Sequence, residues 1–466
     1  MKNKILPGLL IAFGVFVLTT LTVVGPWPAY SSTDVEHKPY YVEALQRIDD
    51  TVKGQANGSA PGPLMAGWGR AVITPTLGTP LAGFGDRKGR PSTGVHDELF
   101  VKALVLSDGD SYAAIIGADM LIVPENVADI ARARIVAETE LKDGDILFNA
   151  SHTHSGPGAF GPGPVSKAFS GAYDETVVDF LGKAFADAVV QAFNALEPAS
   201  VASGSLAVPQ YIRNRARNAA VDPFLDYLRV RQEDGDDGYV VRYSAHPTVL
   251  GGRNMAFSAD FPGYLQRRIE DEVGGFAMYL GGAVGSMGAR VPDGADGFEQ
   301  AQALGYALAD KVLEAASDAE FSSSVAVRAV AVPITPPPFQ LRLTKGWRVS
   351  PLLLPLAGVD HDAWVGAVRV GTVILVGAPG DFSGEISVEL RAWGREQGVD
   401  LWPLSFNADY VGYISPDAYY ADGPWEDDGD FAYETGLMSW CGPNQEAYFT
   451  GLMEHMVTSL YPPGNS

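Results

Sequence analysis

The chain has a single cysteine, Cys441, and few basic residues. One cysteine excludes an intramolecular disulfide and any zinc site built from several cysteines. Lysine and arginine total 33 against 56 aspartates and glutamates, which gives a formal net charge of −23. Because nucleic acids are bound through basic surfaces, this balance argues against a nucleic-acid partner. The sequence also has no internal repeat and no low-complexity tract.

What is present is the composition of a folded protein. Hydrophobic residues make up 46% of the 466 and charged residues 19%, which is enough to bury a sizeable core. At roughly 150 residues per domain, the length suits about three domains or one large α/β domain with insertions. The 53 glycines and 32 prolines indicate many turns and irregular loops.

An uncharged apolar run over residues 5–24 follows Lys2 and Lys4. Its length suits the ~20 residues of a membrane-spanning helix better than the ~7–15 of a signal-peptide core, and a buried helix is a third alternative. We therefore expect residues 1–33 to form a membrane anchor or a cleaved signal. Basic residues before the run and acidic residues after it predict a membrane-anchored protein with its bulk outside the cytoplasm, or a secreted or periplasmic one if the segment is cleaved.

Residues 34–64 are polar and end in GQANGSAPGP, which predicts a stalk and a linker. Beyond them, apolar runs and helical patterns alternate without the strict rhythm of a doubly wound parallel sheet. The clearest helix is expected over residues 174–196, where Val178, Leu181 and Phe185 share one face. The pattern predicts an α/β fold of mixed β-sheets with flanking helices, in a single large domain over residues 65–466.

The strongest local signal for chemistry is NASHTHSGPG at residues 149–158. Residues two apart in a strand face the same side, so His152 and His154 can point into one site at a strand end. Neutral imidazole is a good zinc ligand, and such a pair often serves a metal. Two histidines that cap a turn through hydrogen bonds would give the same pattern.

Other segments also place polar side chains after apolar runs. YSAHPT ends a strand at His246, and GAPGDF presents Asp381 just past another. NADYVGYISP carries Tyr410 and Tyr413, which by default are core aromatics. LGGAVGSMGAR holds Ser286 without the G-x-S-x-G spacing of a nucleophile elbow, which disfavours a serine hydrolase. Each of these segments is weak alone.

Taken together, the order and contents of these segments resemble one family, the neutral (alkaline, non-lysosomal) ceramidases. The resemblance begins at GWGRAVITP, peaks at NASHTHSGPGAF and covers roughly residues 65–461. It implies that residues 65–466 form a zinc hydrolase domain, the N-terminal catalytic domain of that family. The implied reaction is zinc-dependent hydrolysis of the N-acyl bond of ceramide-like lipids to a sphingoid base and a fatty acid. The implied partners are a lipid substrate and a membrane surface.

The resemblance also implies a site. In that family one zinc is held by two histidines, a glutamate and a tyrosine, and the matching positions here are His152, His246, Asp381 and Tyr413. The implied catalytic residues are His154 as proton relay beside the zinc-bound water and Tyr433 at the oxyanion, together with Arg215 and Ser286. His96 is expected to line the substrate pocket.

Three departures from the family pattern affect the substrate more than the metal. Asp381 stands where the family has glutamate, and GGAVGSMG replaces a loop closer to NAGNLSP. The family's C-terminal immunoglobulin-like domain has no counterpart in this sequence. Two alternatives therefore stay open. One is a zinc amidase or esterase acting on a different N-acyl or envelope substrate, and the other is a catalytically degenerate, membrane-anchored binding protein.

Overall fold

The computed structural model describes residues 5–23, 25, 27–30, 34–54, 60–292, 296–352, 362–421, 423 and 432–462. Its helices are α1 (Ile5–Val23), α2 (Pro39–Lys53), α3 (Glu125–Glu138), α4 (Gly163–Ser170), α5 (Glu175–Asn194), α6 (Asp260–Val273), α7 (Gly297–Ala316), α8 (Gly384–Glu396) and α9 (Gln445–Leu460). The α5 helix confirms the clearest helical pattern of the sequence. Asp174 caps it by accepting a hydrogen bond from the Thr176 backbone, as expected of an N-cap residue.

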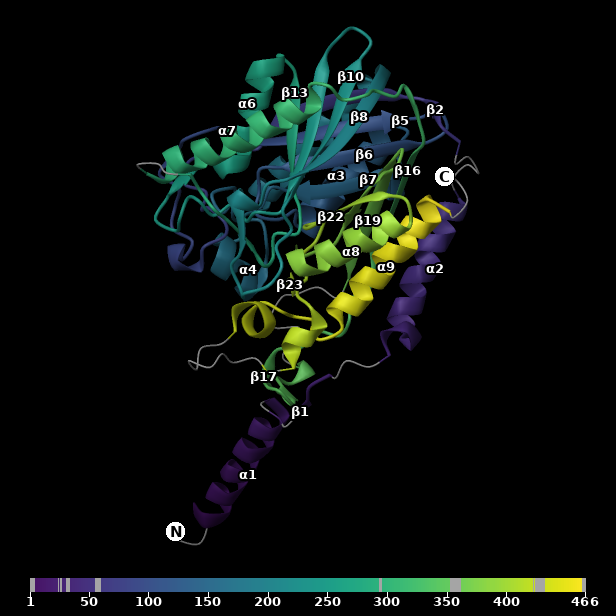
Figure 1. Cartoon of the computed structure of the whole chain (residues 1–466). Coiled ribbons are helices and arrows are strands. Elements are labelled where there is room, and N and C mark those ends of the chain that lie inside the picture. The colour runs from purple at the N-terminus through teal and green to yellow at the C-terminus, as the bar shows by residue number, and fades with distance from the viewer. Residues whose placement is uncertain are drawn as a thin grey trace.

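Two large β-sheets form the centre of the molecule (Figure 1). The first has eight strands in the order β13 (Phe276–Gly281), β11 (Asp237–Tyr243), β10 (Phe224–Gln232), β8 (Glu197–Ala207), β3 (Met65–Val72), β5 (Phe100–Ser107), β6 (Tyr112–Ala118) and β7 (Ile146–Ala150). The second has four, in the order β16 (Val327–Ile334), β19 (Ala363–Val370), β20 (Val373–Gly377) and β22 (Asp400–Leu404). Both sheets mix parallel and antiparallel pairs.

Small sheets of short strands accompany the two large ones. One has three strands, in the order β1 (Trp27–Pro28), β18 (Trp347–Arg348) and β17 (Arg342–Thr344). The others are pairs: β4 (Gly94–Val95) with β12 (Ala256–Phe257), β9 (Ile212–Asn214) with β14 (Met287–Ala289), β2 (Gly62–Pro63) with β15 (Ser324–Val325), and β21 (Asp381–Phe382) with β23 (Tyr413–Ile414).

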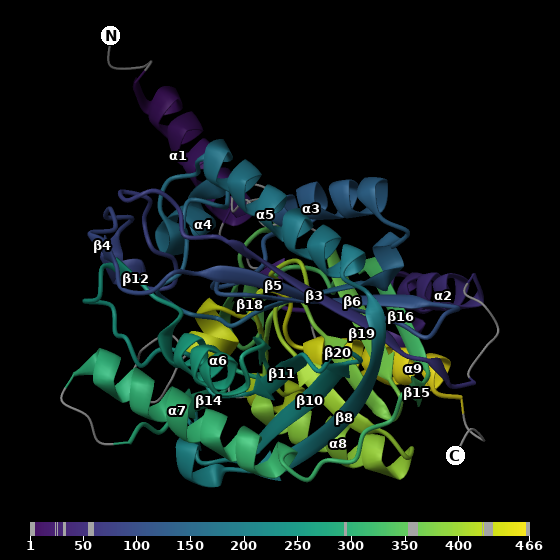
Figure 2. The same cartoon turned by 90° about the horizontal axis from the view of Figure 1, so that it is seen from above.

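The two sheets pack face to face, and helices cover their outer faces. Side chains alternate along β5: Leu104 and Leu106 join the core between the sheets, whereas Val101 and Val105 join the core under α3 and α5. The helices α6 and α7 cover the β10, β11 and β13 end of the large sheet, and α2, α8 and α9 cover the small sheet. Figure 2 shows α3 and α5 on one side of the sheets and α8 and α9 on the other. The predicted α/β fold of mixed sheets with flanking helices, in one large domain, is confirmed.

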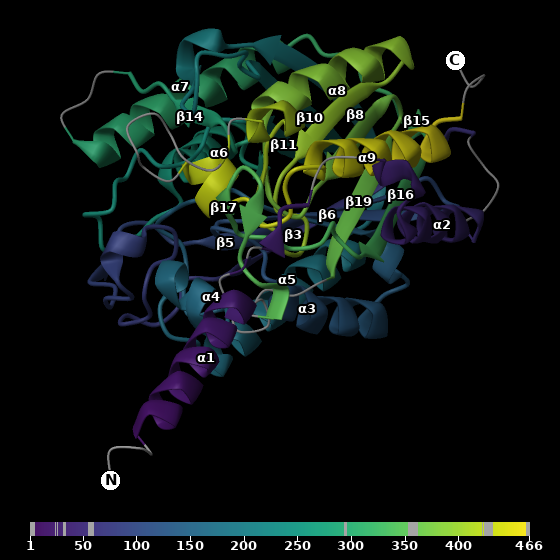
Figure 3. The same ribbon diagram turned by 90° about the horizontal axis from the view of Figure 1, so that it is seen from below.

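The predicted stalk and linker over residues 34–64 contains a packed helix. The apolar face of α2 buries Tyr41, Ala44 and Ile48 in the core that lies against the small sheet. Figure 3 shows α2 beside β16 and α9. The polar composition of this segment reflects the solvated face of an amphipathic helix, which is why it resembled a stalk in the sequence.

The N-terminal apolar run is helical and forms α1. In the part of the chain that the structure describes, no helix combines the length and the apolar character needed to cross a membrane. The anchor or signal expected over residues 1–33 and the expected location outside the cytoplasm stay predictions.

The curvature of the large sheet brings its two edge strands together. The β7 and β13 strands stand at opposite ends of the strand order, yet the Asn149 side chain donates to the Gly281 carbonyl at 3.0 Å and accepts from the Gly281 amide at 2.7 Å. A Cβ on Gly117 of β6 would lie 2.7 Å from the Tyr279 carbonyl oxygen of β13, so only glycine permits this approach. The loops after β7, β11 and β13 therefore converge.

Candidate metal centre

His152 lies just beyond the end of β7, two residues after the strand ends at Ala150. Its backbone has φ of +67°, a left-handed conformation that is unusual for a residue with a side chain. Its Nδ1 contacts the Leu121 carbonyl at 2.6 Å, and its ring stacks on Phe406 with centroids 4.3 Å apart. Because a carbonyl can only accept, Nδ1 carries the proton and Nε2 presents a lone pair.

His246, just beyond β11, is oriented in the same way. Its Nδ1 contacts the Val284 carbonyl at 3.2 Å, which again leaves Nε2 as an acceptor. The His154 Nε2 lies 3.3 Å from His152 Nε2 and 3.0 Å from His246 Nε2. Three imidazole nitrogens thus converge on one point, with their ligand atoms within 4.8 Å of one another.

The electrostatics of this cluster favour a bound cation. Burial lowers the pKa of His152 to about 3 and holds the pKa of His154 and His246 well below their usual range, so all three imidazoles are neutral. One proton on His154 Nε2 could bridge to only one of its two neighbours, which leaves lone pairs facing each other. A metal ion at the centre removes this repulsion. Three buried histidines are thus positioned for metal binding.

Asp381 extends the donor set. It is 1% exposed, and its Oδ1 lies 3.3 Å from His152 Nε2 with no hydrogen-bond partner among the described residues. Burial raises the pKa of this carboxyl to about 7, although hydrogen bonds and Arg215 oppose the rise. A buried carboxylate oxygen without a donor is costly, and a cation beside the three imidazoles would satisfy it. Three nitrogens and one carboxylate oxygen form a set that suits zinc.

Tyr413 and Arg215 lie on the other side of Asp381. The parallel pairing of β21 with β23 sets Asp381 opposite Tyr413. The Arg215 guanidinium donates to the Tyr413 hydroxyl at 2.8 Å and to the Gly285 carbonyl at 2.9 Å. The Tyr433 ring meets the Tyr413 ring edge to face, with centroids 5.5 Å apart. Both tyrosines and Asp381 border the same cavity.

The structure does not bring Ser286 and His96 to this cavity. Ser286 is fully buried, and its hydroxyl donates to Glu385 and lies 3.1 Å from the Ser383 hydroxyl. It therefore secures the loop after β13 instead of facing a substrate. His96 is exposed, stacks on Phe298 with ring centroids 3.8 Å apart and contacts the Tyr264 hydroxyl at 2.8 Å. The expected pocket-lining position of His96 is thus replaced by a surface contact outside the cavity.

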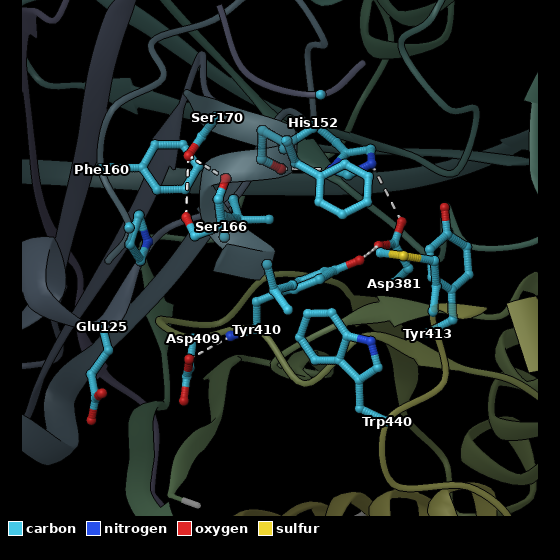
Figure 4. A pocket seen from close by; sticks show the side chains of 18 of the residues that line it. Glu125, His152, Phe160, Ser166, Ser170, Asp381, Asp409, Tyr410, Tyr413 and Trp440 are labelled. Atoms are coloured by element: carbon cyan, nitrogen blue, oxygen red, sulfur yellow. Dashed lines mark hydrogen bonds and ion pairs between the residues drawn. The ribbon is translucent and has the colours of Figure 1, made fainter. Parts of the chain in front are cut away.

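The cavity beside the histidines has a volume of about 220 Å³. His152, Asp381 and Tyr413 stand at one end of it, and Glu125 and Asp409 lie away from them (Figure 4). Most of its wall is apolar, contributed by Leu121, Ile122, Pro124, Phe160, Val165, Phe169, Met438 and Trp440. The site thus combines a polar centre with an apolar chamber, an arrangement typical of small-molecule sites.

Two features near the histidines were not assigned from the sequence. Tyr410 was expected to be a core aromatic, yet its hydroxyl donates to Asp381 Oδ2 at 2.6 Å. Gly83 and Phe84 pack on His154, with the Phe84 ring centroid 4.7 Å from that of the imidazole. The available signals were the pair of tyrosines in NADYVGY and the glycines in LAGFGD. Neither pattern specifies a partner so distant in the chain.

Comparison with known proteins supports the family resemblance found in the sequence. Residues 64–286 match the family described as neutral/alkaline non-lysosomal ceramidase, N-terminal. The chain is similar to a neutral ceramidase of Mycobacterium tuberculosis (strain ATCC 25618 / H37Rv), with 25% identity over 222 residues. That match covers 43% of this chain but only 34% of the relative. The resemblance inferred from the sequence is confirmed.

Solved ceramidases share the fold. The crystal structure of neutral ceramidase from Pseudomonas aeruginosa superposes with a TM-score of 0.71 at 18% identity, covering 85% of this chain and 74% of that chain. A structure described as ceramidase complexed with C2 matches with a TM-score of 0.71 at 17% identity, covering 85% and 75%. At these identities the likeness establishes the fold, whereas the activity has to be argued from the site.

Proposed function

We propose that this protein is a zinc-dependent amide hydrolase that cleaves the N-acyl bond of ceramide-like lipids, releasing a sphingoid base and a fatty acid. The observation that carries the proposal is the convergence of the Nε2 atoms of His152, His154 and His246 at one end of an apolar cavity. The match of residues 64–286 to the neutral/alkaline non-lysosomal ceramidase family supports the same reaction. A substrate of this kind sits in a lipid surface, where we propose that the protein works.

His152, His246, Asp381 and Tyr413 are the proposed zinc ligands. When bound, zinc supplies a Lewis acid that activates water near neutral pH. The backbone carbonyls that hold Nδ1 of His152 and His246 fix these rings with Nε2 aimed inward, as is usual for metal-binding histidines. The donation from Arg215 to the Tyr413 hydroxyl would offset negative charge on that oxygen.

His154 has a different proposed role, that of the proton carrier. Its Nδ1 is buried without a hydrogen-bond partner among the described residues, whereas the Nδ1 atoms of His152 and His246 are held by backbone carbonyls. Its neutral imidazole can accept a proton and release it to the departing amine, as a general acid–base group does. Tyr433, which is partly exposed at the cavity, is the proposed hydrogen-bond donor to the developing oxyanion.

The apolar wall of the cavity supports a substrate with a hydrocarbon chain, because burying such a chain is favourable. Glu125 and Asp409 lie in the same wall and support a second candidate function, hydrolysis of a different N-acyl substrate that carries a polar group. A degenerate binding protein is less well supported, since His152, His246 and Asp381, three of the four proposed ligands, lie around one point with His154 beside them.

The test is zinc content measured together with hydrolysis of a fluorescent ceramide by the full chain. We expect one zinc per chain and fatty-acid release that stops when a chelator removes the metal and returns when zinc is restored. A panel of other N-acyl amides and esters, assayed in parallel, separates the two substrate candidates. A zinc-loaded protein that cleaves none of these substrates would contradict the proposal.

A further inference from the structure

Tyr410 reaches Asp381 because backbone hydrogen bonds tie their segments together. The Asp381 amide donates to the Gly412 carbonyl at 3.0 Å, and the Val411 amide donates to the Pro379 carbonyl at 2.7 Å. These bonds continue the pairing of β21 with β23 into the loop before β23. The two side chains are therefore brought together by the fold and not by a local turn.

The Tyr410 ring is held on several sides. Trp440 meets it edge to face with centroids 5.4 Å apart, and Phe406 stacks on it at 6.5 Å. Phe406 is also the ring on which His152 stacks, so one aromatic column supports both residues. The Tyr410 backbone amide donates to the Asp409 carboxylate at 2.6 Å, which constrains the backbone at this residue. A ring with this support has little freedom to move its hydroxyl.

The Tyr410 hydroxyl engages only one oxygen of Asp381. It donates to Oδ2 at 2.6 Å, while Oδ1 faces His152 Nε2 at 3.3 Å and has no hydrogen-bond partner among the described residues (Figure 4). The carboxylate is 1% exposed, so it is largely removed from bulk solvent. A hydrogen bond of this length to a buried carboxylate is strong and sets the rotation of the carboxyl plane.

We propose that Tyr410 is a positioning residue for the metal centre: by holding Oδ2 of Asp381, it aims Oδ1 at the point where the histidine Nε2 atoms converge. The inference rests on the proposed function only in that the site binds a cation. The aspartate side chain is one methylene shorter than that of glutamate, so fewer of its conformations place a carboxylate oxygen at that point. Its orientation therefore depends more on the group that holds its outer oxygen.

A purely structural tyrosine would behave differently. If Tyr410 only filled space between Trp440 and Phe406, removing its hydroxyl would leave metal binding unchanged. Tyr448 provides a matched control, because its buried ring packs in the same core and its hydroxyl donates to the Thr335 carbonyl at 2.8 Å, away from the cavity. Tyr410→Phe and Tyr448→Phe therefore delete the same atom, one at Asp381 and one elsewhere.

The experiment measures zinc affinity of the full chain by competition with a chromophoric chelator, for wild type, Tyr410→Phe, Tyr448→Phe and His152→Ala. We expect Tyr410→Phe to bind zinc about 10- to 100-fold more weakly and Tyr448→Phe to bind it as wild type does. The absorption spectrum of the cobalt-substituted protein should change in Tyr410→Phe and stay as in wild type in Tyr448→Phe. Melting of the metal-free proteins reports any general loss of stability.

The possible outcomes separate the inference from the proposed function. Unchanged zinc affinity and an unchanged cobalt spectrum in Tyr410→Phe, with zinc binding lost in His152→Ala, would overturn the inference and leave the proposed function standing. An equal loss of affinity in Tyr410→Phe and Tyr448→Phe would also overturn it, because it would indicate a general packing effect. A wild-type chain that binds no zinc would overturn both.

Discussion

At the scale of single residues, the site depends on Gly83 as much as on its histidines. The backbone of Gly83 has φ of +110°, and a Cβ there would lie 2.6 Å from Cγ and Nδ1 of His154. The imidazole therefore occupies the space that any side chain would need. Gly78 has a similar φ of +100°, but a Cβ there would meet nothing within 4 Å. Substituting Gly78 therefore tests the effect of backbone strain without the contact to His154.

We expect Gly83→Ala to displace the His154 ring and to reduce hydrolysis more than about tenfold, since a displacement of ~1 Å at a catalytic group is costly. Gly78→Ala carries only the backbone cost of about 1–2 kcal/mol and should retain activity. Hydrolysis of the fluorescent ceramide and thermal melting of both variants provide the comparison. Equal activity in the two variants would mean that the His154 ring adjusts freely.

The second residue-scale prediction distinguishes His154 from the proposed ligands. The Nδ1 atoms of His152 and His246 are held by carbonyls, whereas that of His154 has no hydrogen-bond partner in the described part of the chain. We therefore expect His154→Gln to retain zinc while losing about 10²- to 10⁴-fold in hydrolysis, the range for a general acid–base group. His246→Ala should lose most of its zinc. Metal analysis of the two purified variants decides the assignment, and loss of zinc from His154→Gln would make His154 a ligand.

At the scale of elements, a buried ionic network joins the two sheets. Arg242 on β11 donates to Asp222 at 2.6 Å and to Asp226 on β10 at 3.2 Å, and its guanidinium also reaches the Pro403 carbonyl on β22 at 2.9 Å. Arg391 on α8 donates to the same Asp226 at 2.7 Å. The side chains of Arg242 and both aspartates are 0% exposed. These bonds fix the small sheet against the large one near the loops that carry the site.

We expect Arg242→Met to lower the free energy of unfolding by about 3–5 kcal/mol, because it leaves two buried carboxylates short of a partner. Arg268→Met is the matched control, since Arg268 pairs with Glu272 and Asp310 on the surface. Its loss should cost less than about 1 kcal/mol. Urea unfolding of both variants measures the difference, and similar values for the two would contradict a stabilising role of the network.

At the scale of the whole molecule, buried acids make stability depend on pH. Asp119 accepts hydrogen bonds from the Phe100 amide at 3.0 Å and the Gln266 side chain at 3.1 Å. Burial nevertheless raises its pKa from 3.8 to about 6. Between these values the native state holds a proton that the unfolded chain has lost. Rising pH therefore removes the stability contributed by this group across that window.

We expect Asp119→Asn to weaken the loss of stability as the pH rises from about 4 to about 6, because asparagine does not titrate. The measurement is the free energy of unfolding in urea at several pH values across this window, for wild type and variant. The two curves should run parallel well above it. Identical pH dependence throughout would mean that Asp119 is ionised in the native state.

The sequence alone determined the features that depend on local spacing. The helical period of residues 174–196 predicted α5, because Val178, Leu181 and Phe185 must share a face to be buried together. The fold class followed from alternating strand and helix patterns. The His-Thr-His motif at the end of an apolar run predicted a polar site at the end of β7, although both histidines lie beyond the strand and His152 has a φ of +67°. These inferences need only the geometry of one element.

The tertiary structure alone decided which of these residues meet. His152 and His246 come together because the curved sheet joins β7 to β13 through Asn149, a contact between residues 132 positions apart. Tyr410 reaches Asp381, and the Ser286 hydroxyl is committed to Glu385, through packing that no local pattern encodes. The spacing of residues along the chain specifies the faces of strands and helices. Contacts between distant elements depend instead on how those faces are buried together in the folded chain.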